Sequence, residues 1–354
     1  MELLLDIALL ALLLITAISI AGIKDLLAAA MLAGIYGLLS AGFFMTMGAV
    51  DVAFTEAAVG AGISPLLIVL TLALCGRQQR GDRQRAMLAL FLVLPVGALL
   101  IVATHDMPAF GAADAPAQMH VAPHYIQQSM AEIGIPNIVT SVLASYRGYD
   151  TFGEVVVIFT AGLGVLSLLM RSQGIDEPTV EPAPNAQSRD IVLRVIAKVL
   201  IAPIMLYALY VQFHGEYGPG GGFQAGVIFA VGFILYGLVF GLDAVRRVAS
   251  HGLVQFLSAV GVLIYGSVGL LSLASGKSFL DYSALASNPV SGQHIGIIAI
   301  ELGVGITVAA VMIMIFYLFA AQLRLQPRGP SLTPDHQGTD AGTAHLASQQ
   351  QGAG

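Results

Sequence analysis

The stretch His214-Gly215-Glu216-Tyr217-Gly218-Pro219-Gly220-Gly221-Gly222-Phe223-Gln224-Ala225-Gly226 joins two long apolar runs, Ile191–Phe213 and Gly222–Leu242. A chain that leaves a bilayer can turn with almost any polar residues. This turn instead uses a histidine, a glutamate, a proline and three consecutive glycines, which permit backbone geometry closed to most side chains. A constrained turn with ionisable residues at the mouth of a membrane protein suggests that ions or protons are handled there.

The composition around this turn is that of a membrane protein. Apolar residues make up 57% of the chain, charged residues only 10%, and the mean hydropathy is +0.84, whereas soluble domains carry about a quarter charged residues. A membrane-crossing helix needs roughly 20 mainly apolar residues. The stretches that qualify are Leu3–Ile23, Leu26–Val50, Val52–Cys75, Met87–Thr104, Gly153–Met170, Ile191–Phe213, Gly222–Leu242, Gly252–Ser275 and Ile295–Ala321. The sequence therefore predicts an all-α, polytopic membrane protein with about nine spans, the second and third separated chiefly by Asp51.

The basic residues predict how these spans are oriented. With the amino terminus outside and the carboxyl terminus in the cytoplasm, only Arg147 and Lys277 of the 15 basic residues fall on the outer side. Basic residues concentrate in cytoplasmic loops of membrane proteins, and losing one span would invert everything after it. Acidic residues lean toward the outer side, which would attract cations there or would simply follow from the basic bias.

Five regions follow from the composition along the chain. We expect a membrane unit at 1–104, an outer segment with interfacial helices and one span at 105–171, a cytoplasmic linker at 172–189, a four-helix membrane unit at 190–323 and a disordered cytoplasmic tail at 324–354. In the outer segment, Asn137 is expected to cap a short helix.

Acids inside apolar spans are costly and are candidates for ion transport. Glu154 opens the fifth span, although Thr151 three residues earlier gives the spacing of a capping box. Asp51 and Glu56 stand at the start of the third span, before Gly60, Gly62 and Pro65, which can break the helix as in transporters. Asp51 could instead cap that helix.

Three further residues are candidates for the ion or proton path. Glu301 is the deepest acid, roughly 9–10 Å into the ninth span, with His294 on the same face; a buried hydrogen bond would also explain it. Lys198, in the sixth span, either extends back to the membrane surface or pairs with an acid. His214 is either an interfacial donor or a transport residue, because histidine is the side chain type whose charge changes near neutral pH.

Several functional classes find no support in the sequence. The chain has no P-loop, no dinucleotide fingerprint, no catalytic triad and a single cysteine, Cys75. We therefore expect no enzymatic activity, no cofactor, no metal site and no nucleic-acid partner.

The turn and its flanking helices resemble the B subunit of the multisubunit Mrp sodium/proton antiporter, whose signature is Pro-Gly-Gly-Gly-Phe-Gln. Gly292-Gln293-His294 and Glu301-Leu302-Gly303-Val304-Gly305 resemble the last helix of that subunit. In the first half, Asp51–Gly62 resembles an MbhD-type domain and Asn137–Glu154 an MbhE-type domain. Both usually form the carboxyl-terminal part of the large Mrp A subunit, so the chain resembles that part fused to a B subunit.

The resemblance implies membership of a complex in the bacterial inner membrane that exchanges Na⁺ for H⁺. The implied partners are A-, C-, D-, E-, F- and G-like subunits and the lipid bilayer. Glu154 and His214 match residues that the family is thought to need for transport, and Glu56 matches less firmly. The chain departs from the family at Ser145, Glu216 and Ala225.

Two other functions remain open at this stage. The wording of Asp51–Gly62 is closer to hydrogenase-associated proteins, so the chain could serve a redox-driven complex such as a membrane-bound hydrogenase or a complex I relative. It could also be an assembly scaffold in which every acid serves capping or packing.

Overall fold

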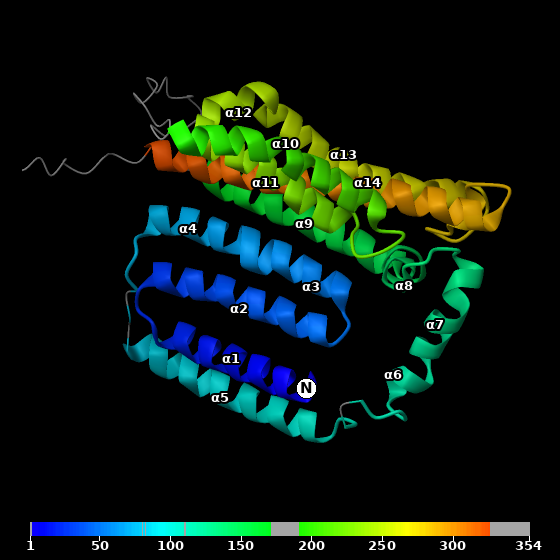
Figure 1. Ribbon diagram of the computed structural model, residues 1–354, viewed down its shortest axis with the longest axis horizontal. Coiled ribbons are helices and arrows are strands. Elements are labelled where there is room, and N and C mark those ends of the chain that lie inside the picture. The colour runs from blue at the N-terminus through cyan, green and yellow to red at the C-terminus, as the bar shows by residue number, and fades with distance from the viewer. Residues whose placement is uncertain (1, 80, 82, 110, 171–190, 326–354) are drawn as a thin grey trace, which may run out of the picture.

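Helices form most of the part of the chain that the structure describes. The structure is a computed structural model and describes all residues except 1, 80, 82, 110, 171–190 and 326–354 (Figure 1). The elements before the outer segment are α1 (Glu2–Gly22), α2 (Leu26–Thr46), α3 (Val50–Glu56), the π-helix η1 (Ala57–Ile63), α4 (Ser64–Cys75) and α5 (Arg83–His105).

The outer segment and the second half follow. The outer segment contains α6 (Pro116–Met119), α7 (Val121–Glu132), α8 (Ile138–Thr140) and a second π-helix, η2 (Ser141–Tyr146). The remaining elements are α9 (Gly148–Met170), α10 (Ile191–His214), α11 (Gly222–Phe240), α12 (Leu242–Val248), α13 (His251–Ala274), the 3₁₀ turn η3 (Tyr282–Ala284) and α14 (Pro289–Leu325). The predicted linker at 172–189 and nearly all of the predicted tail lie outside the described residues.

The nine predicted spans are confirmed. Among the described residues, nine helices are long and apolar enough to cross a membrane, and α3, η1 and α4 together form one of them. No strand occurs in the described part of the chain. The protein is thus an all-helical, multi-pass membrane protein.

The boundary between the second and third spans was predicted too late. The chain breaks between Thr46 and Val50, before Asp51. Gly48 adopts a φ of +74° there, a conformation that glycine reaches without steric cost. Asp51 consequently lies in the first turn of α3 rather than in the break.

The last helix begins earlier than its apolar run. The prediction started it at Ile295, but α14 starts at Pro289. Asn288 accepts a hydrogen bond from the Val290 amide at 3.0 Å, and proline suits the first turn of a helix. At ~1.5 Å per residue, Glu301 therefore lies about 18 Å along the helix from its first residue.

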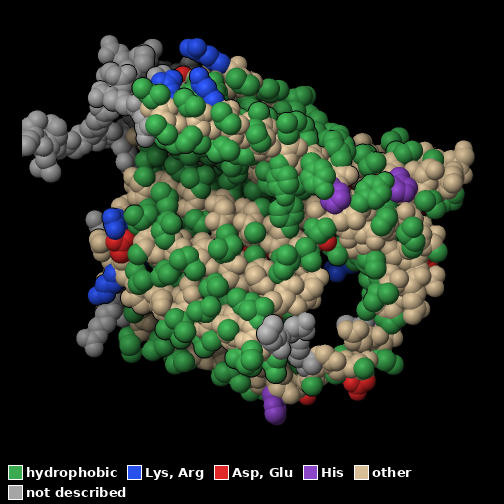
Figure 2. Space-filling model, in the orientation of Figure 1, with side chains coloured by type: hydrophobic (Ala, Val, Ile, Leu, Met, Phe, Trp, Pro, Cys, Tyr) green, Lys and Arg blue, Asp and Glu red, His purple; other side chains and the backbone are tan. Residues whose placement is uncertain are grey.

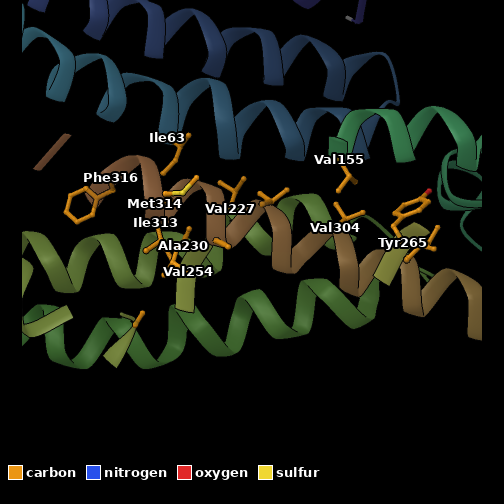
Figure 3. Close-up of a cluster of buried hydrophobic side chains, with 14 of the residues drawn as sticks. Ile63, Val155, Val227, Ala230, Val254, Tyr265, Val304, Ile313, Met314 and Phe316 are labelled. Carbon is orange, nitrogen blue, oxygen red and sulfur yellow. The ribbon is translucent and has the colours of Figure 1, made fainter. Parts of the chain in front are cut away.

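The long helix α14 lies at the centre of the fold. It packs against α9, α11 and α13, and 72% of the residues in its apolar stretch are buried. The amino-terminal helices form a layer beside it (Figure 1), which contacts α11 and α14 through α3, η1 and α4. Figure 3 shows Ile63 of η1 near Val227 of α11 and Val155 of α9 near Val304 of α14 in one buried cluster.

An ion pair ties two loops together at the end of the bundle opposite the glycine-rich turn. Asp25 caps α2 by accepting from the Leu27 and Ala28 amides. Its carboxylate also lies 2.7 Å from Arg77 Nη2, in the loop after α4. The hydrogen bond from Arg77 holds the pKa of Asp25 below its usual value. Lys and Arg side chains gather mainly at this end (Figure 2).

Candidate functional site

The turn between α10 and α11 folds tightly onto α14. The Gly221 amide donates to the Val211 carbonyl at 3.1 Å, which folds the turn back on α10. Gly221 has φ 126° and ψ 177°, a region open essentially to glycine alone. A Cβ on Gly222 would overlap the backbone carbonyl of Glu301. Glycine at these two positions thus permits direct backbone contact between the turn and α14.

The Glu301 carboxylate lies against the backbone of this turn. A methyl group added at Gly215 would lie 3.2 Å from Glu301 Oε2, and one added at Gly221 would lie 3.3 Å from Oε1. The side chain is half-buried. The Glu301 side chain therefore lies directly against the backbone of the turn.

Asp51 connects the amino-terminal unit to the same turn. Asp51 Oδ1 accepts from the Gly220 amide at 3.2 Å, and Gln224 Nε2 donates to Thr55 Oγ1 at 2.8 Å. The N-cap residue of α3 is Ala49, which makes no side-chain capping bond. The Asp51 side chain thus contacts the turn, 169 residues away in sequence, rather than serving as the predicted alternative, an N-cap.

A cavity of about 320 Å³ brings three of the predicted acids together. Asp51 comes from α3, Glu154 from α9 and Glu301 from α14. Neutral polar groups complete its polar lining, namely Thr55, Thr140, Thr151, Gln224 and the backbone of Gly220, Gly221 and Gly222. Carboxylates and neutral oxygen atoms are the groups that bind protons and hard cations.

Glu154 is exposed on this cavity in the isolated chain. The capping-box alternative fails, because α9 already begins at Gly148 and the Thr151 hydroxyl donates to the Leu143 carbonyl at 2.8 Å. Capping therefore does not explain Glu154. A carboxylate on a spanning helix is costly in lipid, so water or another chain must cover it.

The other predicted residues lie outside this cavity. Glu56 is at the end of α3, and its carboxylate folds against Gly60 of η1. His214 stacks on Tyr210, with ring centroids 4.9 Å apart. Lys198 Nζ lies 5.7 Å from the centre of the Phe240 ring and forms no ion pair among the described residues. The lysine contact is the one expected of a side chain that extends along the helix surface.

The structure adds two contacts that the sequence did not link. His294 Nδ1 lies 3.1 Å from Glu216 Oε2. Asn137 Nδ2 donates to the Gly215 and Gly218 carbonyls at 3.1 and 3.0 Å, while its Oδ1 caps α8 as predicted. The sequence marks Glu216 as an ionisable residue of the turn and as a departure from a family pattern, but no local signal joins the turn to residues 137 and 294.

Family comparisons divide the chain into three matches. Residues 192–314 match the family described as domains related to the MnhB subunit of Na⁺/H⁺ antiporters. Residues 11–77 match the MbhD family and residues 90–188 the MbhE family, which are the D and E components of MBH. The chain thus joins segments of all three kinds, as in a fused Mrp A/B-type protein.

Two curated relatives illustrate this fusion. A probable K⁺/H⁺ antiporter protein of the fused A/B type from Rhizobium meliloti (strain 1021) is 30% identical over 230 residues, which cover 59% of this chain and 23% of the relative. A putative antiporter subunit mnhB2 of Staphylococcus aureus (strain Newman) is 31% identical over 132 residues, which cover 36% of this chain and 93% of the relative. The chain therefore spans about a quarter of the first relative and nearly all of the second.

Two solved structures are similar in fold. A chain of the Mrp complex from Dietzia sp. DQ12-45-1b superposes with a TM-score of 0.72 and 26% identity, covering 91% of this chain and 35% of that one. A chain of the membrane-bound sulfane sulfur reductase, an archaeal respiratory membrane complex, superposes with a TM-score of 0.50 and 28% identity, covering 66% and 96%.

Proposed function

This chain belongs to the family of domains related to the MnhB subunit of Na⁺/H⁺ antiporters, and from that premise we propose that it is a non-catalytic subunit of a multisubunit cation/proton antiporter. The complex would lie in the bacterial plasma membrane. The exchanged cation is Na⁺ or K⁺, since the relatives include both an MnhB-type protein and a probable K⁺/H⁺ antiporter protein. The chain would contribute part of the ion and proton path.

The observation that carries this proposal is the cavity between α3, α9 and α14. It is lined by Asp51, Glu154 and Glu301 and by the glycine-rich turn. A carboxylate can hold either a proton or a monovalent cation. Ionised carboxylates that lie close together repel each other, which favours the protonated form of one of them, and a bound cation offsets this repulsion. Arrival of a cation therefore favours release of a proton from the same group, and this competition is the exchange that an antiporter needs.

Partner subunits complete the path in this proposal. Glu154 is exposed in the isolated chain although it belongs to a spanning helix. An A-, C-, D-, E-, F- or G-like subunit that packs there would enclose it and continue the path. The chain covers only 23% of the A/B-type relative, so the remaining parts of the antiporter come from sequence outside this chain.

The remaining candidates have subsidiary roles in the proposal. His214 exchanges protons at the outer face, next to the turn. Glu56 holds a cation beside η1, where the helix is interrupted. Lys198, at the opposite end of α10, contributes positive charge that favours ionised acids on neighbouring helices.

Substitution of Glu154 tests this proposal. Cells that lack other antiporters would express the full complex with Glu154→Gln, which keeps the shape and removes the charge. We expect loss of salt resistance with normal assembly of the complex. The matched control is Asp150→Asn, one turn earlier on α9, where the carboxylate pairs with Arg147 at 2.7 Å outside the cavity. Wild-type resistance of an assembled Glu154→Gln complex would contradict the role of Glu154.

A further inference from the structure

Glu216 and His294 form a pair between the glycine-rich turn and the start of α14. His294 Nδ1 lies 3.1 Å from Glu216 Oε2. The histidine side chain is 33% exposed, whereas the glutamate side chain is only 9% exposed. The imidazole therefore contacts the surface at this end of the bundle, and the carboxylate lies behind it.

One carboxylate oxygen of Glu216 has no partner. Glu216 Oε1 is buried and accepts no hydrogen bond within the described part of the chain. An unsatisfied buried polar atom is costly, and more so when it is charged. Taking up a proton removes the charge, so the position suits a carboxyl group that is protonated for part of a cycle.

The backbone around Glu216 is held rigidly. The Glu216 carbonyl accepts from the Asn137 amide at 3.0 Å, and the Gly215 carbonyl accepts from the Thr140 hydroxyl at 2.7 Å. Neither Asn137 nor Thr140 titrates. The carboxyl group can therefore change its protonation without a large movement of the turn.

The charged groups around the turn come from three helices. His214 ends α10, Asp51 contacts Gly220 from α3, and Glu301 lies against Gly215, the residue before Glu216. The carboxylates of Asp51, Glu216 and Glu301 therefore cannot all stay ionised around this turn without a cost in free energy. Among the described side chains of α14, His294 is the titratable group in contact with Glu216 that can carry a compensating positive charge.

We propose that Glu216 and His294 form a proton-exchange site that passes protons between the outer aqueous phase and Glu301. Water protonates His294 at Nε2, and the proton on Nδ1 then moves to Glu216 Oε2. This leaves a neutral imidazole with its proton on Nε2 and a neutral Glu216. Glu301, on the other side of Gly215, is the next acceptor, reached through water. The proposal rests on the proposed antiporter function.

The ligand of this pair is a proton rather than a metal ion. The described residues contain no group of three or more His, Cys, Asp or Glu side chains that could hold a metal ion. A pair with one imidazole and one carboxylate is, by contrast, sufficient for proton transfer.

The test is proton flux through the whole complex reconstituted in liposomes. Cation-dependent proton movement would be measured over a range of external pH for Glu216→Gln, His294→Gln and the double variant. We expect each single variant to slow transport on the order of tenfold at alkaline external pH, where a relay matters most, and less at acidic pH. The double variant should be no slower than either single variant, because the two groups act as one unit.

The control is a second histidine–glutamate pair in the outer segment. His124 Nε2 lies 3.4 Å from Glu132, and both side chains are about half exposed. The His124→Gln complex should keep the wild-type pH profile. Glu216→Asp retains a carboxyl group, so its complex should keep part of the transport rate at alkaline pH. This variant serves as the test if the Glu216→Gln complex assembles poorly.

Glu301→Gln measured alongside separates the two proposals. If Glu301→Gln stops transport while Glu216→Gln and His294→Gln keep the wild-type profile, the relay is wrong and the antiporter function stands. If Glu301→Gln also transports normally, the proposed function itself is wrong. Additive losses in the double variant would likewise overturn the relay.

Discussion

Glycine is the residue that lets the turn after α10 lie against α14. At Gly221, φ and ψ fall in a region that costs other residues about 1–3 kcal/mol. The neighbouring Glu301 carboxylate leaves a methyl group little room, with Oε1 at 3.3 Å from it. We expect Gly221→Ala to lower the stability of the complex by this amount and to displace Glu301, which would reduce transport as well.

Thermal unfolding of the purified complex measures the stability part of this prediction. Gly164→Ala is the matched control, because Gly164 lies in α9 and a Cβ there meets nothing within 4 Å. Alanine favours a helix over glycine by about 1 kcal/mol, so the control should leave the unfolding temperature equal or higher. Equal unfolding temperatures for Gly221→Ala and wild type would refute the strain.

Residue chemistry alone predicted part of the candidate site. Asp51, Glu154 and Glu301 are acids in apolar surroundings, and this conflict marks them in any single sequence. The Glu216–His294 pair could not be predicted, because 78 residues separate its members and no periodicity connects a turn to a distant helix. Only the folded contact reveals it.

At the scale of elements, hydropathy predicted the spans but not their ends. The apolar runs are long because the membrane core has a fixed thickness, so nine spans follow directly. Helix ends depend instead on local groups that hydropathy ignores. Asn288 and Pro289 start α14 within a polar stretch, and Gly48 ends α2 within an apolar one.

Of the two π-helices, one could be predicted from the sequence and the other could not. Gly60, Gly62 and Pro65 predicted an interruption of the third span, and η1 lies there. Pro65 cannot donate to the carbonyl four residues earlier, which favours a local change in helix register. The second π-helix, η2, contains neither proline nor glycine, so no local signal marks it.

Tertiary contacts account for η2. The Tyr282 hydroxyl donates to the Ala144 carbonyl at 2.7 Å, and the Tyr265 hydroxyl donates to the Gly148 carbonyl at 2.7 Å. Burial raises the pKa of Tyr282, so its hydroxyl keeps the proton that it donates. A local sequence pattern cannot predict contacts between residues that lie so far apart in the sequence.

At the scale of the whole molecule, the central helix α14 is buried and the amino-terminal edge of the described chain is open. In the apolar stretch of α14, 72% of the residues are buried, whereas in the apolar stretch of α5 the share is 0% in the described chain. A spanning helix with no buried residues in this stretch faces lipid or another protein over most of its surface. The amino-terminal layer is therefore the side on which we place contacts with partner subunits.

The predicted orientation of the chain in the membrane determines from which side a thiol reagent should reach Cys75. Cys75 is exposed at the end of α4 and is the single cysteine of the sequence. In the predicted orientation, with the amino terminus outside, three spans precede this point, so the thiol is expected to face the cytoplasm. A membrane-impermeant maleimide should label Cys75 in inverted vesicles and not in intact cells, with Cys75→Ser as the control. Labelling in intact cells would reverse the topology.

The most direct test of the account is the effect of Glu301→Gln on cation-dependent proton flux. The complex would be purified with all its subunits and reconstituted in proteoliposomes, and the flux would be followed with Na⁺ and with K⁺ in turn. Because Glu301 lies against the glycine-rich turn and lines the same cavity as Asp51 and Glu154, we predict a loss of at least about tenfold, with Asp150→Asn at the wild-type rate. Flux at the wild-type rate through an intact Glu301→Gln complex would contradict the claim that the acids lining this cavity carry the exchanged ions.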